Sequence, residues 1–391
     1  MSRRTLALAV LALGSTALAP TFASSASAAS SPTGAVHSKS VCAQAPAGYA
    51  HCNSKVVTRA DGVSPNATTT YTSGYAPADL VKAYSIPRNG STNTIAIVDA
   101  FASPTAQADL NVYRSQFGLG PITITQYNQS GGATLPAGDT GWGQEEALDL
   151  DMASAACPTC AIVYVGGNSA SFADLSAAVK TAAGKGAKVI SNSYGGSEYS
   201  GEVTAQAAYN QPGVAVTVSS GDSGYGAQFP ASSQYVVDVG GTNLARSSTT
   251  RGFTETAWTG GGSGCSAYIT KPTWQHDTGC TRRMGSDLSA VADPNTGVAV
   301  YDSYGSTGGA NWLVFGGTSV AAPLVGGMYA VAGVTSTYPA ATLYASAASL
   351  YDVVSGSNGR CSRFPSYFCN AGSGYDGPTG NGTPNGVTAL H

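Results

Sequence analysis

Charged side chains are scarce in this sequence. Lysine, arginine, aspartate and glutamate together make up 10% of its 391 residues, the formal net charge is -3, and no run of basic residues occurs. Proteins that bind nucleic acid or anionic membrane surfaces need clustered lysine and arginine to hold phosphate groups. The composition therefore predicts no nucleic-acid partner and no charged membrane surface as a partner.

A long apolar run is also absent. A transmembrane helix needs about 20 consecutive apolar residues, and the apolar run Leu6–Leu18 is too short for one. It follows Arg3 and Arg4 and precedes the small residues Ala26-Ser27-Ala28, which is the pattern of a secretory signal peptide. We expect removal of residues 1–29 to leave a secreted, extracellular protein without a membrane anchor. The arginine pair leaves twin-arginine export open as the route.

Eight cysteines fall into four pairs that are close in sequence. The pairs are Cys42 with Cys52, Cys157 with Cys160, Cys265 with Cys280, and Cys361 with Cys369. An even number of cysteines in an exported chain indicates disulfide bonds, and we expect all four pairs to be bridged. The spacing of Cys157 and Cys160 also occurs in redox motifs and in half of a zinc site. No second C-x-x-C motif and no paired histidine accompany it, so a structural bridge is favoured.

The chain divides near residue 74. Residues 30–73 are rich in alanine, serine, threonine and proline and lack periodicity, so we interpret them as an N-terminal extension or a short pro-segment. In residues 74–391, short β-branched runs alternate with alanine-rich helical stretches, which predicts an α/β domain with a parallel sheet flanked by helices on both faces. The expected strands are Thr94–Asp99, Ala161–Val165, Lys188–Asn192, Val214–Ser219 and Tyr235–Val239. The expected helices are Thr105–Phe117, Gln144–Ala155, Phe172–Ala183, Glu202–Gln211 and Ser319–Gly333.

The sharpest local signal is the segment Phe315–Pro323, which reads FGGTSVAAP. Its small residues bring Ser319 to the start of a helix, where a nucleophile is accessible and the helix N-terminus stabilises developing negative charge. Pro323 suits the first helical turn, where its missing N–H costs little. An ordinary turn followed by a helix N-cap is the alternative. The G-T-S-x-x-x-P pattern resembles the nucleophile region of subtilisin-like peptidases.

Histidine, which subtilisins use as a base in a His-Gly-Thr context, is nearly absent. The four histidines are His37, His51, His276 and His391, and none has that context. We therefore expect the base to be a carboxylate. A histidine-dependent enzyme would require His276 to reach Ser319 from a loop.

Glu145 and Asp149 stand four residues apart in a predicted helix and so share one of its faces. Two acids held together can share a proton, because the charge of one raises the pKa of the other. Such a pair can pass the proton between a serine and a leaving group. The alternative is that these acids only complement the helix dipole. We interpret Glu146 and Asp151 as ordinary helix acids.

A third carboxylate, Asp222, follows a predicted strand within the sequence SSGDSG. Subtilisins carry an asparagine at the matching place, which donates a hydrogen bond to the tetrahedral intermediate. An aspartate can donate only when it is protonated, which suits an enzyme that works in acid. A glycine-flanked turn is the alternative.

Taken in order, these motifs resemble the sedolisins, or serine-carboxyl peptidases, whose pattern is E-x-x-x-D on a helix, S-G-D-x-G after a strand, and G-T-S-x-x-x-P. The resemblance implies a subtilisin-like fold and a serine-type endopeptidase that cuts polypeptide substrates at acid pH. It also implies roles for four residues. Glu145 is the general base, Asp149 orients it, Asp222 lines the oxyanion hole and Ser319 attacks.

The resemblance covers roughly Tyr75 to Asn385, and so makes residues 74–391 the peptidase domain. Within it, Ser193-Tyr194-Gly195 resembles the edge segment that pairs with the substrate backbone. Sedolisins usually carry a long folded pro-region, whereas here some 45 residues lie between the expected signal peptide and Tyr75. Asp99 occupies a place that is not generally acidic in the family. It either extends the proton network or caps the following turn, and capping is the favoured interpretation.

The family also carries one structural calcium ion near the C-terminus. The matching residues here are Asp352 and Val353, followed by Gly372, Gly374 and Asp376. By this resemblance two carboxylates and three backbone carbonyls hold Ca²⁺ in a C-terminal calcium-binding loop region, and glycine lets the backbone turn its carbonyls inward. Plain glycine-rich turns are the alternative.

Two functions from different classes remain open at this stage. The first is the peptidase, expected to be a monomer. The second is a catalytically silent exported protein that binds peptides or surfaces on the same fold. The motifs favour the peptidase, because all four catalytic positions are present. Cleavage preference, and endopeptidase versus tripeptidyl-peptidase action, are not predicted.

Overall fold

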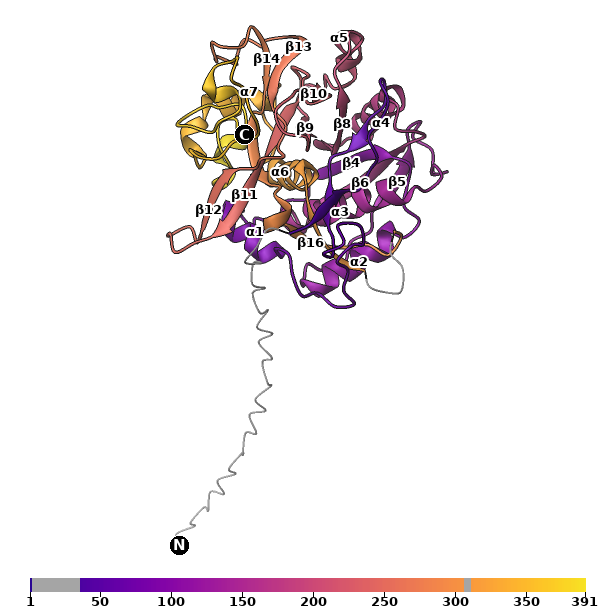
Figure 1. The fold of residues 1–391 in the computed structure, drawn as a ribbon. Coiled ribbons are helices and arrows are strands. Elements are labelled where there is room, and N and C mark those ends of the chain that lie inside the picture. The colour runs from indigo at the N-terminus through magenta and orange to yellow at the C-terminus, as the bar shows by residue number, and fades with distance from the viewer. Residues whose placement is uncertain (2–35, 306–310) are drawn as a thin grey trace.

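The computed structural model describes Met1, residues 36–305 and residues 311–391 (Figure 1). Apart from Met1, the predicted signal peptide lies outside the described residues. Among the described residues, no helix is long and apolar enough to cross a membrane.

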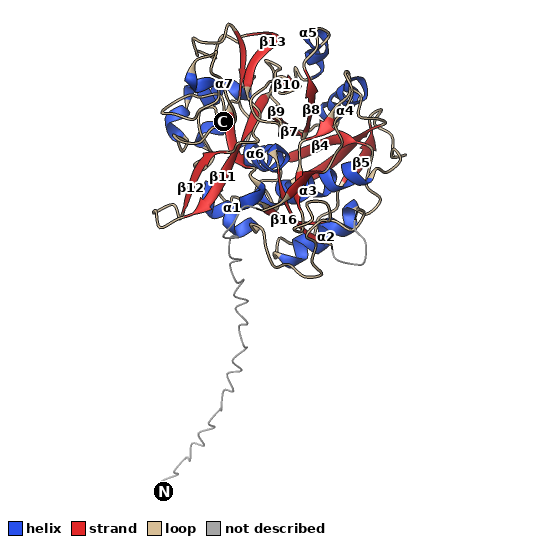
Figure 2. Cartoon of the chain, viewed as in Figure 1, coloured by secondary structure: helices blue, strands red, loops and turns tan. Residues whose placement is uncertain are grey.

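A central sheet of eight strands organises the chain (Figures 1 and 2). Its strands follow the order β12-β11-β9-β7-β4-β6-β5, with β15 paired to β11 beside this path. The pairing of β12 with β11 is antiparallel, and the other pairings described in this sheet are parallel. The strands are β4 (Thr94–Ala100), β5 (Thr125–Asn128), β6 (Ala161–Gly167), β7 (Val189–Asn192), β9 (Ala215–Ser219), β11 (Val237–Arg246), β12 (Phe253–Ala257) and β15 (Leu288–Val291). The predicted α/β class with a mainly parallel sheet is confirmed.

Helices cover both faces of this sheet. Alternate side chains of β4 point to opposite faces, as the period of a strand requires. Ile95 and Ile97 belong to the core that contains α3 and α6, whereas Ala96 and Val98 belong to the core that contains α4. The helices are α1 (Pro77–Tyr84), α2 (Ala106–Gln116), α3 (Thr140–Ala156), α4 (Phe172–Gly184), α5 (Glu202–Ala205), α6 (Thr318–Ala332) and α7 (Pro339–Ala345).

Two predicted helices differ in their bounds. α3 begins at Thr140 rather than Gln144, because the Asp139 carboxylate caps it by accepting hydrogen bonds from the N–H groups of Gly141 and Trp142. The helix expected over Glu202–Gln211 is shorter. α5 gives way to a 3-10 turn, Gln206–Ala208.

Three smaller sheets surround the central one. One has the order β1-β3-β17-β16, one has β10-β8-β2, and β13 pairs with β14 in the third. Their strands are β1 (Ser38–Ser40), β2 (His51–Cys52), β3 (Lys55–Val57), β8 (Tyr194–Ser197), β10 (Gln228–Phe229), β13 (Gly264–Thr270), β14 (Arg282–Gly285), β16 (Val298–Tyr301) and β17 (Trp312–Gly316).

The segment before residue 74 contributes strands to two of these sheets. β1 and β3 join the sheet of β16 and β17, while β2 adds to the edge of β8. The lack of periodicity in residues 30–73 hid these strands, because a strand of two or three residues is too short to show alternation.

All four predicted disulfides are present, and the described residues contain no free cysteine. The Cys157–Cys160 bridge lies between the end of α3 and the start of β6. The bridge agrees with the favoured structural interpretation and leaves neither thiol to bind zinc.

Candidate active site

The site lies at the carboxyl ends of three neighbouring strands, β4, β7 and β9, where ligands bind in open parallel sheets. Asp99 stands near the end of β4, Ser193 follows β7, and Asp222 follows β9. The N-terminus of α6 brings Ser319 to the same place, since Ser319 Oγ donates a hydrogen bond to the Ser193 carbonyl at 3.1 Å. The segments around Ser193, Asp222 and Ser319, which are far apart in the chain, therefore meet here.

Ser319 is the second residue of α6 and is completely buried. Its backbone N–H points out of the helix start, where the first N–H groups have no partner within the helix. That N–H donates to the Asn53 carbonyl at 2.9 Å. Gly317, the N-cap, has a φ of 101°, a conformation that favours glycine. A side chain there would also collide with the Asn53 carbonyl and with Asp222.

Asp222 is fixed by the residue beside the nucleophile. Its Oδ1 accepts hydrogen bonds from the Thr318 N–H at 2.7 Å and from the Thr318 hydroxyl at 3.0 Å. Its Oδ2 has no hydrogen-bond partner among the described residues. Burial raises the pKa of Asp222 to about 7, against the opposing effects of the Lys55 charge and the bonds from Thr318. The free oxygen can therefore carry a proton in acid.

Glu145 and Asp149 lie one turn apart on α3, a helix that is buried on nearly all sides. Both are completely buried, and none of their carboxylate oxygens has a hydrogen-bond partner of regular geometry among the described residues. Burial raises the pKa of Glu145 well above its ordinary value, and the charge of Asp99 adds to this rise. The hydroxyls of Ser319 and Ser54 oppose it, which places both of them near the Glu145 carboxylate.

The pKa of Asp149 is also raised well above its ordinary value. Burial is the main cause, followed by the charges of Asp99 and Glu145. The pair on α3 therefore behaves as coupled acids in a dry environment, where one shared proton is favoured over two charges.

Asp99 completes this acidic cluster. Its side chain is fully buried, and burial raises its pKa to about 8. Neither oxygen accepts a hydrogen bond from a described residue, so Asp99 does not cap the turn that follows β4. The favoured interpretation was therefore wrong. The charge of Asp99 acts instead on the two acids of α3.

The two acids interpreted as ordinary have structural partners. Glu146 accepts a hydrogen bond from the Ser103 N–H at 2.6 Å, and Asp151 accepts one from the Tyr301 N–H at 3.0 Å. Each therefore satisfies the backbone of a neighbouring segment.

The predicted substrate-binding segment, Ser193-Tyr194-Gly195, is paired within the chain itself. Gly195 and Tyr194 in β8 pair antiparallel with His51 and Cys52 in β2. The Ser193 carbonyl accepts a further hydrogen bond from the Asn53 N–H at 3.1 Å. Sequence reasoning missed Asn53 altogether, and the Cys42/Cys52 pair was the one local sign that this region is ordered.

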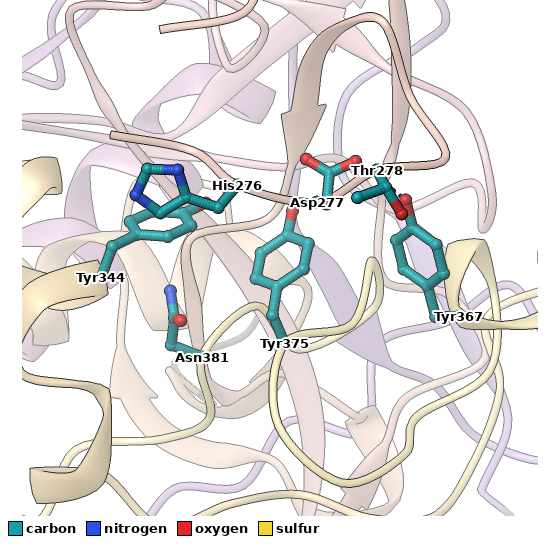
Figure 3. Close-up of a pocket in the computed structure, with 7 residues that line it drawn as sticks. All are labelled: His276, Asp277, Thr278, Tyr344, Tyr367, Tyr375 and Asn381. Atoms are coloured by element: carbon teal, nitrogen blue, oxygen red, sulfur yellow. Dashed lines mark hydrogen bonds between the residues drawn. The ribbon is translucent and has the colours of Figure 1, made fainter. Parts of the chain in front are cut away.

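The histidine alternative is not supported. His276 is exposed and lines a pocket of about 400 Å³ with Tyr344, Tyr367 and Tyr375 (Figure 3). Among the described residues, no histidine forms a hydrogen bond with Ser319, Glu145 or Asp149. The titratable groups whose pKa values the structure links to the Ser319 region are carboxylates, Glu145 among them.

The chain matches the family model described as the subtilase family over residues 133–352. This range spans more than half of the sequence and includes all four predicted catalytic residues. The chain belongs to the subtilase family.

Two characterised subtilases are similar to this chain over most of its length. Kumamolisin from Bacillus sp. (strain MN-32) is 31% identical over 358 residues, which cover 81% of this chain and 63% of kumamolisin. Sedolisin from Pseudomonas sp. (strain 101) is 32% identical over 362 residues, which cover 79% of this chain and 60% of sedolisin. The chain thus spans less than two thirds of the length of these relatives.

A solved structure of Pseudomonas sedolisin, described as a serine-carboxyl proteinase complexed with two molecules of pseudo-iodotyrostatin, has the same subtilisin-like fold. The TM-score is 0.67 at 26% identity, and the match covers 82% of this chain and 96% of that one. The homology to sedolisin and kumamolisin identifies the chain as related to serine-carboxyl peptidases.

The residues predicted to hold calcium form one loop arrangement. Gly374 N–H donates to Asp352, and Gly372 N–H donates to Asp376, each at 2.9 Å. Two acids thus contact the same glycine-rich loop. No hydrogen bond among the described residues ends on the carbonyl oxygens of Val353, Gly372 or Gly374. Both Asp376 oxygens accept hydrogen bonds, Oδ2 from Gly372 and Oδ1 from Thr379. Carboxylate and carbonyl oxygens are the donors that Ca²⁺ prefers, so the chemistry of this donor set fits the ion.

Proposed function

We propose that this protein is a secreted serine-carboxyl endopeptidase that hydrolyses peptide bonds at acid pH. One observation carries the proposal. Ser319 is buried at the N-terminus of α6 among acids with raised pKa values, and no histidine in the described part of the chain forms a hydrogen bond with its hydroxyl. The similarity to sedolisin and kumamolisin supports the same reaction class.

In the proposed first step, the Ser319 hydroxyl loses its proton to Glu145 and its oxygen attacks the peptide carbonyl. The hydroxyl donates to the Ser193 carbonyl in this structure, so it must first rotate toward Glu145. Asp149, one helical turn away, shares a proton with Glu145 and orients its carboxylate.

The negative charge that forms on the carbonyl oxygen has two donors in this proposal. One is the Ser319 N–H at the positive end of α6, and the other is the protonated Oδ2 of Asp222. Glu145 then protonates the leaving amine, and the peptide bond breaks. Water hydrolyses the remaining ester of Ser319 by the same proton transfers in reverse.

Acid favours this arrangement for a simple reason. Asp222 donates only while it is protonated, and burial keeps it protonated up to about pH 7. Burial likewise keeps a proton on the coupled acids near Ser319 into a range where exposed carboxyls have lost theirs. A histidine base would be protonated, and therefore inactive, in the same acid range.

Secretion, the calcium ion and the division of the chain belong to the same proposal. Four disulfides suit an oxidising, extracellular environment. The carboxylates of Asp352 and Asp376, with the carbonyls of Val353, Gly372 and Gly374, would hold one structural Ca²⁺. Residues 74–391 would form the peptidase domain behind a cleaved signal peptide, residues 1–29.

Substitution of the nucleophile tests the proposal. Ser319→Ala removes one hydroxyl, so activity on a denatured polypeptide at about pH 4 should fall by about a millionfold or to background, while the melting temperature stays unchanged. Ser115→Ala, on an exposed position of α2, is the control and should remain active. Glu145→Gln should be inactive as well. Proteolysis that persists in purified Ser319→Ala would refute the assignment. A wild-type protein inactive from acid to neutral pH would instead favour a silent binding protein.

A further inference from the structure

The segment Tyr49–Val57 crosses the proposed active site in the manner of a bound peptide. We propose that it is an internal substrate. The Asn53–Ser54 peptide bond would be the bond presented to Ser319, and the segment would block the enzyme until that bond is cut. The inference rests on the proposed peptidase function and adds to it a processing site and a substrate preference.

The backbone pairing before Asn53 is the first argument. β8 is paired on one side with β10, and on its other side it takes β2 as an added antiparallel strand. His51 lies opposite Gly195, Cys52 opposite Tyr194, and the Asn53 N–H donates to the Ser193 carbonyl at 3.1 Å. Addition of a strand to a sheet edge is a general way for a protein to hold a peptide. The Ser193 carbonyl, which accepts this last bond, also accepts the hydrogen bond from Ser319 Oγ.

The position of the Asn53 carbonyl is the second argument. Its oxygen accepts a hydrogen bond from the Ser319 N–H at 2.9 Å. The oxygen and the unpartnered Oδ2 of Asp222 also approach the same side of Gly317, where a side chain would collide with both. A carbonyl held by the N–H of a nucleophilic serine at a helix N-terminus occupies the place where an oxyanion is stabilised.

The Asn53 side chain is the third argument. It is completely buried, with 1% of its surface exposed, in a segment that sequence alone describes as irregular. Its Nδ2 donates to Ser219 Oγ at 2.9 Å, and the amide shares with the Gln228 side chain the space beside Gly195. Ser219 ends β9, three residues before Asp222. A small polar subsite therefore precedes the cut bond. It binds the Asn53 Nδ2, while the buried Oδ1 has no hydrogen-bond partner among the described residues.

The chain is held equally well after the bond. The Ser54 hydroxyl lowers the pKa of Glu145, the proposed base, although neither Glu145 oxygen has a hydrogen bond of regular geometry among the described residues. Lys55 then lies opposite Gly316, and Val56 opposite Phe315, in the antiparallel pairing of β3 with β17. Strand pairing on both sides of Ser319 aligns the Asn53–Ser54 bond across the nucleophile, as catalysis by orientation requires.

Two clamps explain how a bound substrate can also act as an inhibitor. The Cys42–Cys52 disulfide constrains the residue next to Asn53, and the Val41 N–H donates to the Ser54 carbonyl at 3.1 Å across the bond. A new Ser54 amine held in this way stays beside the acyl group, so re-formation of the peptide bond competes with hydrolysis. A rigid loop also loses little entropy on binding.

The proposed cleavage balances as follows. Ser319 Oγ bonds to the Asn53 carbonyl carbon, the bond from that carbon to the Ser54 nitrogen breaks, and the serine proton moves through Glu145 to the Ser54 amine. Water then cleaves the ester, leaving an Asn53 carboxylate and a free Ser319. Both cysteines of the clamp precede Asn53, so the cut frees the segment before Ser54 with its disulfide intact. Release of β2 would then expose the edge of β8.

The test uses the full secreted chain purified near neutral pH and then held at about pH 4, where the proposed acids are protonated. Intact-mass and N-terminal analysis should show a new terminus at Ser54 in the wild type and none in Ser319→Ala. Peptidase activity should rise in step with the appearance of that terminus. A cut at Ser54 in isolated Ser319→Ala, which would mean another protease made it, would overturn the inference.

Variants of the subsite sharpen the test. Asn53→Lys places a charged chain in a buried amide site, and a mismatch at a site built around a hydrogen bond should slow the cut on the order of 100-fold or more. Val63→Lys, at an exposed position after the end of this segment, is the control and should be cut like the wild type. Equal rates for the two variants would contradict the subsite.

A synthetic peptide of residues 41–57 with its disulfide closed provides a readout that does not depend on self-cleavage. It should compete with substrate for the processed enzyme, and the same peptide with Asn53→Lys should bind on the order of 100-fold more weakly. If the wild type degrades a denatured polypeptide while its chain stays uncut and the peptide has no effect, the inference fails and the peptidase function stands. If neither the polypeptide nor the chain is cut, both fail.

Discussion

The two oxygens of Asp222 have different surroundings, and this difference suits the side chain to its proposed catalytic role. Thr318 occupies Oδ1 with two hydrogen bonds, which leaves Oδ2 without a partner among the described residues, on the side of Gly317 that the Asn53 carbonyl also approaches. An asparagine can reproduce both halves of this arrangement, because its carbonyl oxygen can accept from Thr318 and its amide can donate on the other side. The difference is that an amide donates at every pH.

The pH profile of Asp222 variants should reveal this difference. Because burial raises its pKa to about 7, the wild type should lose activity as pH rises through neutrality, when the donor becomes a negative charge facing the oxyanion. Asp222→Asn should keep activity in acid and lose part of this neutral-side decline. Asp222→Ala, the control, should lose about 100-fold to 1000-fold in kcat at acid pH. Steady-state rates measured across the pH range decide the matter, and an unchanged decline in the asparagine variant would contradict the role of Asp222.

At the scale of elements, the close approach of α3 and α6 positions the acids against the serine. Glycines on α6 permit this approach. Gly327 faces Ala156 on α3, and Gly326 faces Val189 and Thr217 on the sheet. A methyl group at Gly327 would lie 2.5 Å from the Ala156 Cβ, so one of the two helices would have to move.

Gly327→Ala should therefore lower the free energy of unfolding by about 1–3 kcal/mol through overpacking, even though alanine is the better helix former. It should also reduce kcat, because it shifts the helix that carries Glu145 relative to the helix that carries Ser319. Gly184→Ala, near the end of α4 with open space around it, is the control and should be neutral or slightly stabilising. Denaturant melts and rates of both proteins provide the comparison. Equal unfolding free energies and equal kcat values for Gly327→Ala and Gly184→Ala would mean that the contact between α3 and α6 accommodates the methyl group.

At the scale of the whole molecule, the C-terminal loops are held by few regular elements. The stretch that carries Asp352 and Asp376 consists of turns, isolated bridges and one short 3-10 helix, Ser366–Phe368, and it is braced by the Cys361–Cys369 disulfide. A metal ion that binds only the folded protein would stabilise this region by mass action.

Removal of calcium should therefore lower the melting temperature. Occupancy at a concentration 100 times the Kd contributes about 2.7 kcal/mol, which chelation would abolish. Thermal melts with and without a chelator, followed by re-addition of Ca²⁺, measure the effect. Asp376→Asn should reduce the response to calcium, whereas Asp277→Asn, in the neighbouring loop, should keep it. A melt that is indifferent to the ion in metal-free protein would exclude Asp352 and Asp376 as ligands.

The sequence by itself determined the parts of this protein that depend on local chemistry. Alternation of short strands with helices predicted the parallel sheet, and four neighbouring cysteine pairs predicted the four disulfides. The motifs around Glu145, Asp222 and Ser319 could be read because each is short and contiguous in the chain. The structure brings these motifs together at one end of the sheet.

Only the tertiary structure decided what depends on burial and on pairing between distant segments. Asp99 looked like a turn cap, yet its surroundings remove water and hydrogen-bond partners and make it part of the acid cluster. Asn53 stands in a stretch without periodicity, and nothing in its neighbours predicts that it meets Ser319, 266 residues later by their numbers. Such contacts arise from long-range strand pairing, for which strands of two or three residues leave no pattern in the sequence.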